Sequence, residues 1–169
     1  HIAQDDKAAL VRFLKGATSD YVEKFEPLRV ARHFRVAQEA LACDDVILRL
    51  EPCSSEDECR VLVAMKAPPK KGLILETVKL LSRADLFIKR SYADYFTTDE
   101  DDGLAIMSFY VSLPDQGGQC LTEDSEVWQR LTRELPLVKW FAPHDLEAYA
   151  EEEGWSLRRV MLLQAAGEF

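Results

Sequence analysis

The chain has 169 residues, a formal net charge of −9, 47% hydrophobic residues and 30% charged residues. These values are typical of one globular domain with a real core, and they exclude a disordered chain. The acidic balance argues against a nucleic-acid surface or an anionic-membrane surface, because both need clustered Lys and Arg. No apolar stretch approaches the length that spans a bilayer. The cysteines are scattered without a C-x-x-C pair, which favours reduced thiols and a cytoplasmic location.

Residues 1–45 predict a helical N-terminal arm. Residues 5–15 read as a short helix that Gly16 closes. A longer helix follows, with Pro27 in its first turn and apolar residues at helical spacing, namely Val30, Phe34, Ala37 and Leu41.

Residues 46–142 predict an α+β domain. Its expected elements are strands 46–50 and 59–65, a helix over 73–84, strands 85–98 and 104–113, a helix from Thr122 to Pro136 and a short last strand over 137–141. From residue 59 the order is β-α-β-β-α-β, the split βαβ or ferredoxin-like arrangement. In that arrangement both helices cover one face of an antiparallel sheet. The other face is expected to lack a helix of its own and to meet another domain or subunit.

Alternation of side chains predicts which residues share a face of the sheet. Over 59–65 one face carries Cys59, Val61, Val63 and Met65 and the other carries Leu62 and Ala64, so this strand is expected to be largely buried. Over 85–98 one face is expected to carry Leu86, Ile88, Arg90, Tyr92 and Phe96.

Residues 143–169 predict a C-terminal helical extension. Ser156 is placed as the N-cap of a last helix, and the helical pattern is still running at Phe169 without a C-cap. We therefore expect the chain to be a segment of a longer polypeptide, with a missing region downstream.

The loop between the second strand and the first helix of the domain is the most distinctive stretch, KAPPKKGLI. Together with the β-α-β-β-α-β order, it resembles an ACT domain, a small regulatory module that often binds amino acids where two domains meet. The loop keeps the Pro, Gly and Leu of that family at Pro69, Gly72 and Leu73. It departs from the family by inserting Lys70 and Lys71 and by lacking the usual acidic residue.

The flanking segments ARHFRVAQEAL, RADLFIKRSYADYF and SLRRVMLLQAAGEF are similar to parts of the large bacterial NAD-dependent glutamate dehydrogenases. This resemblance spans roughly residues 25–169. It implies a non-catalytic regulatory or assembly segment that packs against other domains of its parent chain and against sister subunits. The parent would oxidise glutamate to 2-oxoglutarate with NAD, and its nicotinamide site and catalytic lysines would lie outside this chain.

The candidate ligand-binding residues are Lys70, Lys71, Gly72 and Leu73. At a strand-to-helix turn, the helix dipole and two ammonium groups could hold the carboxylate or phosphate of a small-molecule effector. The simpler interpretation, which the sequence favours, is a pair of solvated lysines with Gly72 supplying a positive φ. No catalytic or metal-binding residue is predicted, and no cofactor motif such as G-x-G-x-x-G follows a strand.

Other polar residues are given structural interpretations. His33, between Arg32 and Arg35, is expected on a partly exposed, solvated helix face. His144 is expected to border a helix. The acidic runs 99–102 and 151–153 are expected to be a solvated turn and an exposed helix face.

Two further functions stay open. One is a free-standing sensor of ACT type for an amino acid or small anion, which the missing acid in the loop weakens. The other is a small enzyme on a ferredoxin-like scaffold, which the absence of clustered His, Cys or paired carboxylates weakens.

Overall fold

The structure is a computed structural model that describes residues 4–43, 45–53, 58–66, 73–98, 103–113 and 120–139, together with residues 154, 156 and 159. In chain order its elements are α1 (Gln4–Lys15), α2 (Ser19–Glu23), α3 (Pro27–Cys43), β1 (Ile47–Pro52), β2 (Cys59–Lys66), α4 (Leu73–Arg83), β3 (Phe87–Thr97), β4 (Gly103–Ser112), α5 (Glu126–Glu134) and the 3-10 helix η2 (Leu135–Lys139). Within these ranges, no helix has both the length and the apolar character needed to cross a bilayer.

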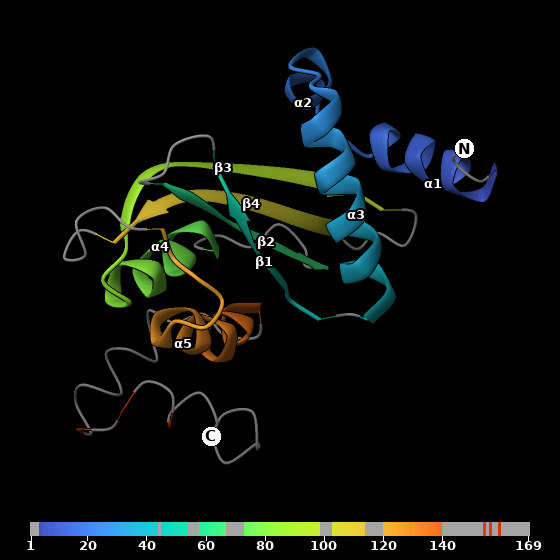
Figure 1. Ribbon diagram of the computed structural model, residues 1–169. Helices are drawn as coiled ribbons and strands as arrows, with labels where there is room; N and C mark the ends of the chain where they lie inside the picture. Colours follow the sequence, from blue (N-terminus) through green and yellow to red (C-terminus); the bar gives the residue numbers. More distant parts are fainter. Residues whose placement is uncertain are drawn as a thin grey trace.

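The four strands form one antiparallel sheet in the order β1-β2-β4-β3 (Figure 1). The fold is therefore α+β, as the sequence predicts. Since β2 and β3 are both antiparallel to β4, they run parallel to each other with β4 between them. The predicted hairpin between β3 and β4 is confirmed by the pairing of Thr97 with Gly103.

One face of the sheet packs against α4, α5 and η2, which lie together on the same side in Figure 1. This core includes Val61, Val63 and Met65 of β2, Met107 and Phe109 of β4, and Leu81, Leu131 and Leu135 of the helices. Each large side chain buried here contributes roughly 1.5–3 kcal/mol of transfer free energy. The alternation predicted for residues 59–65 is confirmed.

The opposite face of the sheet is partly covered by α3, which corrects the expectation that this face has no helix of its own. A second core joins Val36, Ala37 and Ala40 of α3 to Leu62, Ala64, Leu104, Ile106 and Phe96 of the sheet. Tyr21 of α2 belongs to the same core and is 2% exposed. The arm predicted over residues 1–45 thus shares a buried cluster with the sheet.

The last strand predicted over 137–141 is wrong for residues 137–139, which belong to the 3-10 helix η2. A short apolar run fits a strand and a buried helical turn equally well, and Pro136 has no N–H to give to a ladder. Residues 140 and 141 lie outside the described residues. The position beside β2 is taken instead by β1, so the order from β1 to α5 is β-β-α-β-β-α.

The helix expected from Thr122 begins instead at Glu126, with Ser125 as its N-cap. The Ser125 side chain accepts a hydrogen bond from the backbone N–H of Trp128 at 3.2 Å. Thr122 and Ser125 bound a turn closed by a 3.1 Å backbone hydrogen bond. The helix therefore begins after this turn, with a hydroxyl residue of the type that caps helices well.

A bulge in β3 changes the facing predicted for its first residues. The register shifts between Ile88 and Arg90, so that Ile88 pairs with Val111 and Arg90 with Tyr110. Because a bulge adds one unpaired residue, the alternation reverses across it. Ile88 therefore packs in the core beside α4, whereas Arg90 lies on the α3 face with Tyr92 and Phe96.

Helix α1 reaches the sheet through a close backbone contact at Gly16. The N–H of Thr97 donates to the Gly16 carbonyl at 2.9 Å, and Ala17 forms an isolated bridge with Phe96. A Cβ at Gly16 would overlap the Thr97 carbonyl. Glycine is therefore needed here for the approach itself.

Helix α4 ends in a Schellman motif. The N–H of Leu86 donates to Leu81 at 3.2 Å and the N–H of Asp85 donates to Ser82 at 3.0 Å, the two hydrogen bonds that define this motif. Asp85 has φ of 59°, in the left-handed region.

The helical extension expected over 143–169 falls almost entirely outside the described residues. The N–H of Arg159 lies 3.4 Å from the Ser156 hydroxyl oxygen, which is the contact expected of an N-cap.

Candidate functional site

The loop chosen from the sequence lies mostly outside the described residues, which include neither Lys70, Lys71 nor Gly72. Leu73 begins α4 and is 3% exposed. Its side chain belongs to the core under α4. Any contribution of Leu73 to a ligand would therefore come from its backbone.

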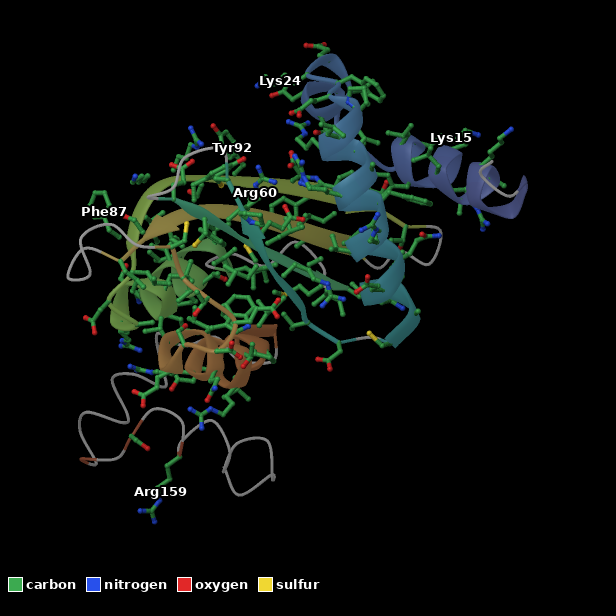
Figure 2. The ribbon with its side chains drawn as sticks, in the orientation of Figure 1. Lys15, Lys24, Arg60, Phe87, Tyr92 and Arg159 are labelled. Atoms are coloured by element: carbon green, nitrogen blue, oxygen red, sulfur yellow. The ribbon has the colours of Figure 1, made fainter. Side chains whose placement is uncertain are left out.

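A different site is formed by what we call the polar cleft, between the first half of α3 and the sheet. Its volume is about 600 Å³. It is lined chiefly by Tyr21, Lys24, Arg29, Arg32 and His33 from the helical side and by Arg60, Arg90, Tyr92, Asp94, Ser108 and Tyr110 from the sheet. Figure 2 shows Arg60 and Tyr92 on the side of the sheet that faces Lys24 and α2.

The strand register builds the floor of the polar cleft. Arg60 of β2 pairs with Tyr110 of β4, which pairs with Arg90 of β3. The three side chains therefore lie in one row across three strands, on the face of the sheet that packs against α3. The row itself lines the cleft and does not belong to the core under α3. The guanidinium carbons of Arg60 and Arg90 lie 4.9 and 4.0 Å from the centre of the Tyr110 ring, within cation–π range.

Each of these two arginines forms an ion pair with a carboxylate. Arg60 donates to Glu51 at 2.7 Å, and Arg90 donates to Glu58 at 2.5 Å. Both carboxylates line a neighbouring hollow of about 850 Å³. Each guanidinium is thus fixed by a ring and a carboxylate together, and this limits the entropy lost when a ligand binds.

The helical wall of the polar cleft carries Arg29, Arg32 and His33. Their spacing of i, i+3 and i+4 puts them on one side of α3. The guanidinium of Arg29 stacks over the Tyr21 ring at 4.3 Å and donates through Nη2 to the Tyr21 carbonyl at 3.2 Å. Nε of Arg29 is buried and has no hydrogen-bond acceptor among the described residues.

His33 is 3% exposed, so the expectation of a partly exposed face is wrong. Its Nδ1 lies 3.2 Å from the Tyr21 hydroxyl and 3.8 Å from an Asp94 carboxylate oxygen. Burial lowers the pKa of His33 to about 3, and Arg29, Arg32 and Arg60 act in the same direction. At neutral pH the contact with Asp94 is therefore not an ion pair.

Burial also shifts the pKa values of the two residues that contact His33, Tyr21 and Asp94. Burial raises the pKa of Tyr21 to about 12, against the opposing effect of Arg29. Burial also raises the pKa of Asp94, although Arg29 and Lys24 oppose it. A protonated phenol and a neutral imidazole thus share the hydrogen bond on this wall.

The cluster does not have the arrangement of a catalytic centre. A histidine with a pKa of about 3 is a poor general base at neutral pH, since it binds protons too weakly. Ser108 lines the polar cleft, but the hydrogen bond of the His33 ring goes to Tyr21 and not to this serine. The cleft's surplus of fixed N–H donors suits the binding of oxygen anions.

Most of the other residues considered from the sequence lie outside the described part of the chain. His144, residues 99–102 and residues 151–153 lie outside the described residues. The four cysteines are free thiols, as expected, and burial raises the pKa of Cys59 to about 11. Within the described ranges, no group of three or more His, Cys, Asp or Glu residues could hold a metal ion.

Sequence reasoning missed the polar cleft, although part of its signal was present. Arg60 and Arg90 interrupt apolar or aromatic strands, and Arg29, Arg32 and His33 recur at helical spacing. That these arginines and His33 line one cleft follows only from the sheet order and from the way α3 crosses the sheet.

No family model matches the sequence, and no curated protein is significantly similar to it.

Proposed function

We propose that this chain is a non-catalytic regulatory or assembly segment, with a ferredoxin-like fold of ACT type, from a large NAD-dependent glutamate dehydrogenase. One observation carries the proposal: β2 and β3 run parallel on either side of β4, and α4 and α5 cover the same face. A β-α-β-β-α unit of this kind is the body of a ferredoxin-like domain. The edge that such a domain gives to its last strand is filled here by β1.

The segment would act by contact with the rest of a parent enzyme in the cytoplasm. An effector that binds one state of the assembly better than another would shift the equilibrium between them. NAD and the catalytic lysines would belong to the downstream region. The partners would be other domains of the parent and sister subunits.

Sequencing the gene beyond Phe169 tests the parentage. We expect a continuous reading frame into a glutamate dehydrogenase core. A stop codon there, or a different catalytic domain, would overturn the proposal.

Deleting residues 1–142 from that parent tests the role. We expect the catalytic region to keep glutamate oxidation but to change its oligomeric state or its response to small-molecule effectors. Unchanged assembly together with an unchanged effector response would refute a regulatory or assembly role.

A second candidate is a free-standing ACT-type sensor, and the polar cleft favours a small anion over an amino acid as its ligand. Three arginines that line the cleft, Arg32, Arg60 and Arg90, suit oxygen anions; Arg32 and Arg60 share Glu51, and Arg90 pairs with Glu58. The stop codon that would overturn the first candidate is the result that this one predicts.

A further inference from the structure

The polar cleft is basic in a chain that is acidic as a whole. Five basic side chains line it, namely Lys24, Arg29, Arg32, Arg60 and Arg90, against three acidic ones, namely Asp20, Glu26 and Asp94. The chain itself has a formal net charge of −9. Since His33 is neutral, the lining itself has an excess of two positive charges, and the partners Glu51 and Glu58 of Arg60 and Arg90 lie outside it. The cleft therefore favours an anion over a cation.

The row of Arg60, Tyr110 and Arg90 supplies the donors on the floor. Two guanidinium groups on one ring would repel each other, and the carboxylates of Glu51 and Glu58 offset that repulsion. A guanidinium has five N–H donors. The hydrogen bonds of Arg60 with Glu51 and Tyr110, and of Arg90 with Glu58, therefore leave further donors for a ligand in the cleft.

Arg29 and Arg32 supply donors from the opposite wall. Arg32 lies 3.7 Å from Glu51, so it belongs to the same charge network as Arg60. The buried Nε of Arg29 has no acceptor among the described residues, and a buried donor without an acceptor is costly.

Asp94 limits where negative charge can sit. Its carboxylate lines the same cleft, two rows of the sheet from Arg90 and 3.8 Å from His33. Negative charge placed directly beside Asp94 would be repelled. The charged groups of the ligand must therefore cluster at the end with Arg60 and Arg90.

We infer that the polar cleft is a binding site for a small dianion, a phosphate monoester or a short dicarboxylate, held between Arg29 and Arg32 of α3 and the Arg60–Tyr110–Arg90 row of the sheet. This site is a different candidate from Lys70 and Lys71, which lie outside the described residues. Anion binding at this site is a property of the chain itself. Only the regulatory effect of that binding rests on the proposed function.

Calorimetric titration of the chain with sodium phosphate and, separately, with sodium succinate tests the site, with chloride holding the ionic strength constant. We expect saturable binding of at least one dianion. Preference for phosphate would identify a phosphate ester as the ligand class, and preference for succinate a dicarboxylate. Absence of saturable binding to either anion at concentrations on the order of 10 mM would overturn the inference.

Three variants locate the binding. Arg60→Gln with Arg90→Gln is expected to weaken it roughly tenfold or more, because charge-assisted hydrogen bonds are lost. Arg49→Gln is the matched control: Arg49 lies on β1, pairs with Glu39 and does not line the polar cleft. The Lys70→Ala, Lys71→Ala pair is also expected to bind normally.

Binding that survives the Arg60 and Arg90 substitutions, or that is lost with the two lysines instead, would overturn the assignment. Circular dichroism checks that each variant is folded. If the double arginine variant does not fold, Arg32→Gln on the half-exposed side of α3 takes its place, with the same expected loss. Failure of binding would leave the proposed parentage standing, because sequencing and deletion test that independently.

Discussion

His33 makes the stability of this fold depend on pH. The folded chain keeps this imidazole neutral down to about pH 3, whereas its ordinary pKa is 6.5. Between those values the unfolded chain binds a proton that the folded chain does not. Stability is therefore full above about pH 6.5 and falls as the pH drops towards 3, by about 1.4 kcal/mol per pH unit for one proton.

Urea unfolding at about pH 7, 6 and 5 measures this dependence in the wild type and in His33→Gln. In the variant, the free energy of unfolding should depend less steeply on pH, by about 1.4 kcal/mol per pH unit, because one proton fewer is taken up on unfolding. The raised pKa of Asp94 works in the opposite direction at the acidic end, since its folded state gains a proton first as the pH falls. Equal slopes in the two proteins would show that His33 is not held neutral.

A second prediction at this scale concerns Gly16. Gly16→Ala should lower the free energy of unfolding by roughly 1–3 kcal/mol, because its Cβ would overlap a backbone carbonyl that cannot turn away. Thermal and urea unfolding both report the loss. An unchanged or higher midpoint would mean that α1 does not dock as closely as the bond from Thr97 implies.

The end of α4 allows a stabilising prediction at the scale of elements. Asp85 is exposed and holds a left-handed conformation that glycine adopts without cost. Asp85→Gly should raise the free energy of unfolding by about 0.5 kcal/mol, whereas Asp85→Ala should lower it by roughly 1 kcal/mol. Opposite signs for these two variants in a thermal melt are the expected result, and equal signs would contradict the cap.

Some elements could be predicted from sequence because their signal is local. Pro27 marks the first residue of α3, and the alternation in β2 and β4 reports two different buried faces. The errors arose where local signals were ambiguous. The run after Pro136 fits a strand or a tight helical turn, and the bulge before Arg90 leaves no mark in the pattern of residue types.

The arrangement of the whole molecule decided the points that the sequence could not. His33 lies between two arginines in the chain, and this suggests a solvated face until α3 is laid across the sheet. The polar cleft likewise depends on residues that are far apart in sequence, such as Arg29, Arg60 and Arg90. Their meeting is a property of the register and of the crossing of α3, which no local pattern encodes.

Removing α1 to α3 should therefore expose the second core of the molecule. A chain that begins at residue 45 would leave Leu62, Ile106 and Phe96 open to water, although each is at most 3% exposed in the complete fold. We expect strong binding of a hydrophobic dye and self-association in size-exclusion chromatography. A monomeric, cooperatively folding truncated chain would show instead that residues 46–142 are an independent unit.

Over the described residues, β3 is an edge strand of the sheet, and it is 11 residues long. A long, flat and regular edge strand can pair with a strand of another molecule and begin a cross-β stack. The bulge at Lys89 twists the strand and breaks its regular spacing of N–H and carbonyl groups, and the charges of Arg90 and Asp94 follow it. The same irregularity that brings Ile88 into the core is therefore expected to hinder strand addition at this edge.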